Sequence, residues 1–113
     1  IELPLADAKV YRTHTTMGEK TLNTLDDMQG VAAIIRSHHE YFNGTGFPDA
    51  LSGKSIPIGA RIVAIVEAYE ELQSGDYAKA ESTPADAVRV ILSNKGTLFC
   101  PEMTDVFVKA LRG

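Results

Sequence analysis

The sequence predicts an all-helical, single-domain fold of about five helices, and two observations carry that prediction. Apolar residues recur at the spacing of an amphipathic helix along most of the chain, and no segment shows the strict alternation of a half-buried strand. A length of 113 residues, with 44% hydrophobic and 23% charged residues, is sufficient for one hydrophobic core. We therefore expect residues 1–113 to form one domain.

The first two helices are predicted from their apolar positions. Residues from about 5 to 25 have a helical pattern, with a kink expected near Gly18, where the missing side chain would also let another helix or a ligand approach His14. A second helix is expected from about 31 to 41, where His38 falls on the same face as three aliphatic residues. His38 should therefore be at least partly buried.

Proline residues indicate where the remaining helices begin. Ser55 lies two residues before Pro57, as expected for the start of a third helix over residues 58–72. Ser82-Thr83-Pro84 gives the same signal for a fourth helix. The last helix opens at Phe99-Cys100-Pro101, and its apolar side chains are expected to face inward: Met103, Val106, Phe107, Ala110 and Leu111.

The composition argues against several classes of protein. A net charge of −4 and a pI near 5.3 oppose broad attachment to a nucleic-acid polymer or an anionic membrane. The single cysteine, Cys100, permits no internal disulfide, so a reducing compartment and a cytoplasmic location are expected. No apolar run reaches the roughly 18 residues of a spanning helix. The chain opens with Ile1 instead of methionine, which we interpret as a piece of a longer protein.

Three histidines and one acid are the candidate metal ligands: His14, His38, His39 and Glu67. Neutral imidazole and carboxylate suit iron, manganese, zinc or nickel. Adjacent helical residues point about 100° apart, so the histidine pair favours a polynuclear site over a single ion. The alternative is that each residue is a hydrogen-bonded group of a helical core, with Arg61 or Arg36 as the ion-pair partner of Glu67.

A glycine-rich loop follows the histidine pair and supplies the other candidates. Glu40 either orients a histidine or is an exposed acid near a helix end. Gly44 and Gly46 would let the backbone pass close to a ligand. Two further groups are open to both a functional and a structural interpretation: the cations Lys54, Arg61 and Lys79 as phosphate contacts or surface charges, and the aromatic residues Phe47, Tyr69 and Tyr77 as base-stacking or core residues.

The string His-His-Glu-Tyr-Phe-Asn-Gly-Thr-Gly-Phe-Pro over residues 38–48 closely resembles the second half of HD-GYP domains. Later segments extend the resemblance over nearly the whole chain, among them Ile56-Pro57-Ile58, Ala60-Arg61-Ile62 and Ala68-Tyr69. HD-GYP domains are bacterial, all-helical phosphodiesterases of the HD superfamily that hydrolyse cyclic di-GMP. The resemblance implies an HD-domain-like helical bundle, present here without the N-terminal helices that carry the His-Asp dyad.

The resemblance also implies a role for each candidate residue. His14, His38 and His39 fall on metal-ligand positions, and Glu67 falls where the family usually has a ligating aspartate; the implied metals are two or three iron or manganese ions, which this chain alone need not retain. The predicted substrate-binding residues are Lys79, which stands at the family's lysine position, together with the signature loop. Glu40 and Arg61 are predicted to lie behind the ligands and to support them. The loop residues of that set are Gly44, Gly46, Phe47 and Pro48.

Several positions depart from the family pattern. No His-Asp pair occurs in the chain, Asn43 stands where an aspartate is usual, and Phe47 replaces the tyrosine of the Gly-Tyr-Pro signature. Glu67 is one methylene longer than the usual aspartate. Asp76 puts an anion where an arginine is expected, which should weaken binding of a dianionic ligand.

From the sequence we interpret the chain as the C-terminal portion of an HD-GYP domain of a bacterial signalling protein that hydrolyses cyclic di-GMP in its intact parent. The parent is expected to carry a sensor or receiver domain, and apolar surface left open by absent helices makes a homodimer an expected partner state. This chain alone is expected to be inactive without the dyad. The alternatives are a catalytically degenerate module used for regulation or protein contacts, and a phosphohydrolase of the same superfamily that acts on another nucleotide.

Overall fold

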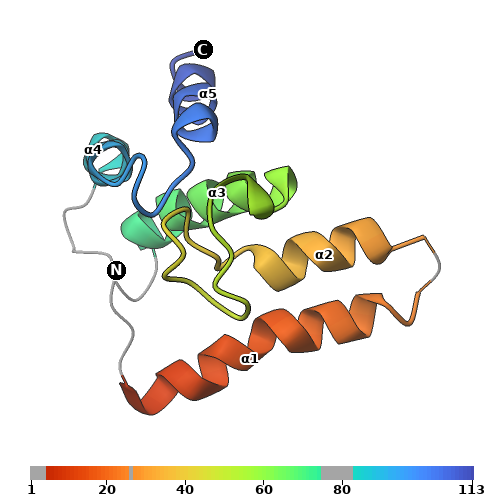
Figure 1. The fold of residues 1–113 in the computed structure, drawn as a ribbon. Helices are drawn as coiled ribbons and strands as arrows, with labels where there is room; N and C mark the ends of the chain where they lie inside the picture. The colour runs from red at the N-terminus through yellow and green to blue at the C-terminus, as the bar shows by residue number, and fades with distance from the viewer. Residues whose placement is uncertain (1–4, 26, 75–82) are drawn as a thin grey trace.

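The computed structural model describes residues 5–25, 27–74 and 83–113, with the side chains of the first helix described from residue 13 onward. Five α-helices follow one another, and the described residues contain two isolated bridges but no strand (Figure 1). The all-helical fold with about five helices is confirmed. The helices are α1 (Leu5–Leu22), α2 (Gln29–Ser37), α3 (Ile58–Ser74), α4 (Pro84–Ser93) and α5 (Pro101–Leu111), with a short 3₁₀ helix η1 (Gly53–Ser55) before α3.

The helices form two groups on either side of α3. Figure 1 shows α1 and α2 as an antiparallel pair, with α3 next to α2 and with α4 and α5 on the far side of α3. The long segment between α2 and α3 lies beside α2, where Asp49 contacts Arg36, and beside the turn before α5, where the N–H groups of Phe42 and Asn43 donate to the carbonyls of Leu98 and Thr97. This arrangement brings the middle of α1, the end of α2 and the middle of α3 to one region. No described helix has the length and apolar character needed to cross a bilayer.

Two glycines allow the close approach of the helices. A Cβ atom on Gly18 of α1 would lie 2.6 Å from Cγ2 of Ile35, and a Cβ on Gly59 of α3 would lie 2.5 Å from Cδ1 of Ile34. Because neither glycine has a side chain, the two isoleucines of α2 can pack directly against α1 and α3. The expectation that Gly18 admits another helix beside His14 is confirmed, and the helix is α2.

A hydrophobic core forms where α3, α4 and α5 meet. Ile65 and Ala68 of α3, Ile91 of α4 and Phe99 are buried together. Burial of these apolar side chains stabilises the contact between the helices. Partly buried residues pack around this core: Tyr69, Leu72, Leu98, Met103 and Phe107.

The predicted start of α4 is confirmed in detail. The N–H of Asp86 donates to the Thr83 hydroxyl at 3.2 Å, and the N–H of Thr83 donates to the Asp86 carboxylate at 3.0 Å. This reciprocal capping pair, followed by Pro84 in the first turn, satisfies backbone N–H groups that a helix start leaves without partners.

Two expectations about the helices are wrong. The second helix ends at Ser37, four residues earlier than predicted, and His38 is its C-cap. The N–H of Glu40 donates to the Ser37 carbonyl at 3.0 Å, so the chain turns here although the apolar spacing continues. In α5, Val106 is 58% exposed and Ala110 and Leu111 are also exposed, because only part of the apolar face reaches the core.

Candidate metal centre

His38 is held at the end of α2 by a backbone hydrogen bond. Its side chain is buried, and its Nδ1 lies 2.6 Å from the carbonyl oxygen of Ile35 in the preceding turn. A carbonyl only accepts, so the Nδ1 carries the proton that is donated. A neutral His38 ring therefore carries its lone pair on Nε2, where it can act as an acceptor or a ligand, and Nε2 donates a hydrogen bond only when the ring is protonated.

The other two histidines come together at the Nε2 side of His38. His14 reaches it from the middle of α1, with 3.3 Å between the two Nε2 atoms. His39 follows His38 in the turn, and its ring centroid lies 4.3 Å from that of His38 and 4.9 Å from that of His14. One ring nitrogen from each histidine lies within 4.8 Å of the others. These are all the histidines of the chain.

Glu67 completes the cluster from α3. Its Oε2 lies 3.3 Å from Nε2 of His38, and its Oε1 lies 3.0 Å from Nε2 of His39. The Glu67 side chain is 36% exposed, whereas those of His38 and His39 are 7% and 13% exposed. The acid therefore stands on the more open side of the cluster. The structure brings all four candidate ligands together from α1, the end of α2, and α3.

The shared contacts move the pKa values of these groups. Hydrogen bonds from His38 and then from His39 hold the pKa of Glu67 well below its usual range, so the acid is ionised at neutral pH. Burial opposes the charged form of His38, but its hydrogen bonds with Glu67 and Ile35 outweigh burial and raise its pKa. At His39 burial prevails and lowers the pKa.

The donor set and its spacing fit a divalent transition metal. Two nitrogen ligands that are each about 2.1 Å from one ion in tetrahedral geometry lie roughly 3.4 Å apart, and the His14 and His38 Nε2 atoms are 3.3 Å apart. Imidazole nitrogens together with an ionised carboxylate are a ligand set for iron, manganese or zinc. A cation at this point would accept electron pairs from the three imidazoles, and the carboxylate of Glu67, which contacts two of them, lies beside it.

The geometric reason for expecting a polynuclear site is not upheld. That expectation placed His38 and His39 on one helix, about 100° apart. Because α2 ends at Ser37, His39 lies in a turn, and its ring faces the same point as the other two imidazoles. The described cluster alone gives no preference for several ions over one.

Glu40 is the buried anchor of the loop that follows the histidines. It is 2% exposed, and its two carboxylate oxygens accept the backbone N–H groups of Asp49 at 2.7 Å and Leu51 at 2.8 Å. The exposed acid considered from the sequence is therefore excluded. The described hydrogen bonds of Glu40 hold the loop, instead of orienting a histidine as the other interpretation required.

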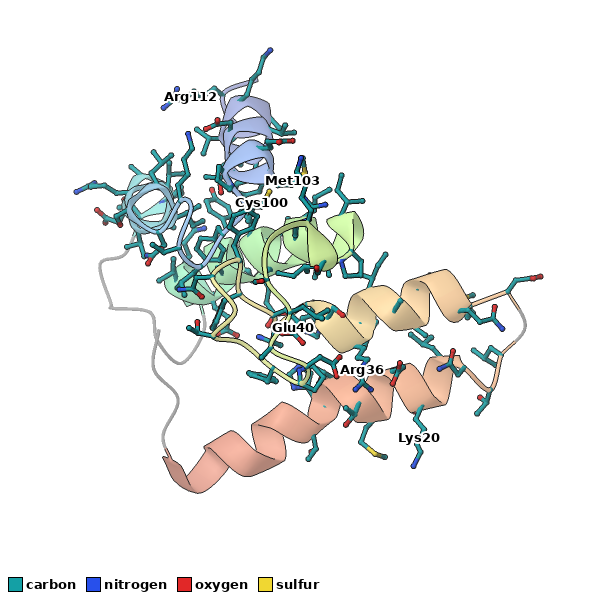
Figure 2. The ribbon with its side chains drawn as sticks, viewed as in Figure 1. Lys20, Arg36, Glu40, Cys100, Met103 and Arg112 are labelled. Carbon is teal, nitrogen blue, oxygen red and sulfur yellow. The ribbon has the colours of Figure 1, made fainter. Side chains whose placement is uncertain are left out.

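Arg36 fastens the same loop to the two N-terminal helices. Its Nε and Nη2 donate to the two carboxylate oxygens of Asp49 at 2.8 and 2.9 Å, and its Nη1 donates to Glu19 of α1 at 2.8 Å. Figure 2 shows Arg36 between α1 and α2. A planar guanidinium suits this bidentate contact. This role of Arg36 was not predicted from the sequence, where Arg36 was considered only as a partner for Glu67.

The loop lies directly against the backbone of the histidine pair. A Cβ atom on Gly46 would meet the His39 carbonyl oxygen, and would lie 2.5 Å from the Tyr41 nitrogen and 2.6 Å from Cα of Glu40. Only glycine fits there. Phe47 donates its N–H to the His39 carbonyl at 3.3 Å, and its ring stacks on the His39 imidazole. Gly44 has a φ of +85°, and Pro48 directly follows Phe47 in the turn.

Other predicted site residues lie away from the cluster or outside the described chain. Arg61 donates to the Ile56 carbonyl at 3.0 Å and to Sγ of Cys100 at 3.4 Å, so its described contacts join α3 to the start of α5 and do not reach the ligands. Lys54 is largely exposed, 3.9 Å from Glu102. Lys79 and Asp76 fall outside the described residues.

Comparison with known proteins gives consistent matches. Residues 3–103 match the HD domain family. A cyclic di-GMP phosphodiesterase of Thermotoga maritima is 32% identical over 103 residues, covering 89% of this chain and 28% of the relative. The cyclic di-GMP phosphodiesterase response regulator RpfG of Xanthomonas campestris is 31% identical over 105 residues, covering 91% and 28%.

A solved structure agrees with these sequence matches. The crystal structure of a cyclic GMP-AMP-specific phosphodiesterase of Vibrio cholerae, V-cGAP3, superposes with a TM-score of 0.79 at 25% identity. The match covers 93% of this chain and 24% of that chain. The present chain thus spans about a quarter of the length of the relatives that it matches, which carry further sequence outside the shared region.

The packing of Gly46 predicts a large difference between two alanine substitutions. We expect Gly46→Ala to lower the free energy of unfolding by about 2–3 kcal/mol or more, because the new methyl group would collide with backbone atoms that cannot move aside. Gly30→Ala is the matched control, since its Cβ meets nothing within 4 Å; it should be neutral or stabilise by up to about 1 kcal/mol. Urea unfolding monitored by circular dichroism measures both, and equal effects would contradict the proposed contact.

The Arg36–Asp49 contact predicts a pH-dependent contribution to stability. Hydrogen bonds from Arg36 lower the pKa of Asp49 below its usual 3.8. The contact therefore stabilises the fold above that value and is lost as the pH falls through the lower pKa of the folded state. Asp49→Asn should cost no more than about 1 kcal/mol near pH 6, because the pair is partly exposed, and less near pH 2. In an Arg36→Gln background the pH dependence should disappear; its persistence there would contradict this assignment.

Proposed function

The chain belongs to the HD domain family, and from that premise we propose that it supplies four ligands to the metal centre of a cyclic dinucleotide phosphodiesterase. The ligands are His14, His38, His39 and Glu67. The observation that carries the proposal is their convergence: three imidazole nitrogens lie within 4.8 Å of one another, and a carboxylate contacts two of them. The favoured metals are iron and manganese, which accept both nitrogen and oxygen ligands.

The proposed chemistry is hydrolysis of a phosphodiester bond. A divalent metal, when bound, lowers the pKa of water and neutralises charge that develops on the phosphate. The chain's own part is to present the ligands: the Ile35 carbonyl fixes the proton of His38 on Nδ1, and ionised Glu67 supplies a negative charge on the open side. The proposed binding surface for the nucleotide borders this side and includes Gly44, Gly46, Phe47 and Pro48.

A cyclic dinucleotide is the proposed substrate of the intact parent, with cyclic di-GMP first and cyclic GMP-AMP second. Relatives named for each of these two substrates match most of this chain. Lys79 remains a predicted phosphate contact. We also propose a bacterial cytoplasmic signalling protein with a sensor or receiver domain as the parent, as one of the matched relatives is named a response regulator.

Metal titration tests the ligand assignment. We expect the 113-residue chain to bind Mn²⁺, and we expect His14→Ala, His38→Ala and His39→Ala each to weaken binding by about 100-fold or more, because each removes one ligand. Glu67→Gln should weaken binding by at least about tenfold. Glu70→Gln is the matched control, an exposed acid on the same helix, and should leave the affinity unchanged.

Isothermal titration calorimetry gives the affinities, and circular dichroism checks that each variant remains helical. Unaltered Mn²⁺ affinity in the three histidine variants would contradict the proposal. No binding of Mn²⁺ or Fe²⁺ by the unaltered chain would do so too, and would favour a module used for protein contacts.

A second prediction concerns turnover. The chain contains no His-Asp pair, so we expect the 113-residue chain with Mn²⁺ to show no hydrolysis of cyclic di-GMP above that of the metal alone. Linear dinucleotide and GMP, separated by chromatography, provide the readout. Rapid hydrolysis by this chain, lost in His38→Ala, would show that the four ligands suffice without the dyad and would overturn the prediction.

A further inference from the structure

We propose that Phe47 is a positioning residue, whose ring sets the plane of the His39 imidazole, and that Glu40 holds the loop that places this ring. The inference rests on the proposed function, because it assigns a role toward the same centre. This inference assigns Phe47 a contact with the proposed metal ligand His39, in addition to the position beside a nucleotide that is expected for its loop.

The contact between the two rings is parallel. The ring centroids of Phe47 and His39 are 5.2 Å apart, and the ring planes differ by 8°. The χ2 torsion of histidine has broad energy wells, so the side chain itself does not determine the plane of its ring. A flat aromatic face against the imidazole opposes rotation about χ2, because a turned ring would press its edge into the phenyl group.

His39 is thereby constrained from two directions. Phe47 covers one face of its ring, and Oε1 of Glu67 lies 3.0 Å from its Nε2. His38 obtains a comparable constraint from the hydrogen bond between its Nδ1 and the backbone of α2. Because His39 lies beyond the end of α2, the loop supplies part of the support that the helix provides for His38.

Residues before and after Phe47 in the sequence are fixed by contacts, and they hold Phe47 in place. Before it, Gly46 packs without space for a side chain against the backbone of residues 39–41. After it, Asp49 and Leu51 donate their N–H groups to the buried carboxylate of Glu40. Arg36 then binds the Asp49 side chain through two nitrogens. These contacts leave the Phe47 ring little freedom to move away from His39.

Nuclear magnetic resonance of the metal-free chain tests the ring contact directly. Ring currents should place the C–H protons of His39 at high field, and Phe47→Leu should move them to lower field, because leucine fills a similar volume without a ring. Phe47→Tyr keeps the ring and should restore the high-field position. Phe107→Leu, which removes a ring packed on Tyr69 in the core, is the control and should not move the His39 signals.

Mn²⁺ titration then tests the consequence for the centre. We expect Phe47→Leu to weaken Mn²⁺ binding by about tenfold, in the range found for residues that support metal ligands, with Phe47→Tyr close to the unaltered chain. Glu40→Gln is the second variant: its amide turns a donor toward a backbone N–H, which should loosen the loop and move the His39 signals in the same direction as Phe47→Leu.

The outcomes separate this inference from the proposed function. Unmoved His39 signals and unchanged Mn²⁺ affinity in helical Phe47→Leu would overturn the positioning role while leaving the four ligands in place. Equal weakening in Phe47→Leu and Phe107→Leu would also overturn it, since general destabilisation would then explain the loss. Absence of Mn²⁺ binding by the unaltered chain would overturn the proposed function, and the resonance positions would still decide whether Phe47 holds the ring.

Discussion

The contact of Glu67 with His38 and His39 is the constraint on which the rest of the structure depends. An ionised carboxylate that is partly removed from water is costly without a compensating donor or cation, and the two imidazoles supply that compensation at 3.3 and 3.0 Å. The pairing requires the middle of α3 to lie at the end of α2. The close approach of α3 to Ile34, made possible by Gly59, meets that requirement. The same placement of α2 between α1 and α3 therefore determines both the helix packing and the geometry of the site.

Two further charged residues, Glu40 and Arg36, support the cluster of histidines and Glu67 from outside it. Glu40 and Arg36 contact the loop, not the ligands, and they act on different parts of it: Glu40 binds backbone N–H groups, and Arg36 binds the Asp49 side chain. A buried carboxylate that accepts two N–H groups makes strong, directional contacts. The loop is in this way fixed to both α1 and α2. We infer that the placement of the His39 ring depends on these loop contacts, because His39 lies beyond the end of α2.

Much of the fold and of the site could be predicted from local patterns, and the remainder depends on partners distant in the sequence. Apolar spacing and the Thr83-Pro84 signal predicted the helices, because these features act over one or two turns. The chemistry of the residue types identified the four candidate ligands that the structure brings together. The early end of α2 was not predicted, because the apolar spacing continues through His38, whereas the N–H of Glu40 turns back to the Ser37 carbonyl and the loop packs against residues 39–41. The contact of Arg61 with Cys100 could not be predicted either, because Cys100 lies 39 residues away. The role of Glu40 could have been predicted, because an acid just before a glycine-rich loop is well placed to accept hydrogen bonds from the loop's N–H groups.

The resemblance to HD-GYP domains led us to expect an aspartate at the position of Glu67, so the contacts of Glu67 bear directly on the proposed donor set. The sequence alone suggested that an extra methylene would displace the carboxylate or a metal. In the structure the longer side chain spans two histidines, with a different oxygen directed to each. The Glu67 side chain is thus long enough to contact both His38 and His39. Its pKa lies well below the usual range, so Glu67 carries a negative charge that favours a bound cation. The three imidazole nitrogens lie close together, and the Glu67 carboxylate contacts two of them. A glutamate in place of the expected aspartate is therefore not a sufficient argument against the proposed centre.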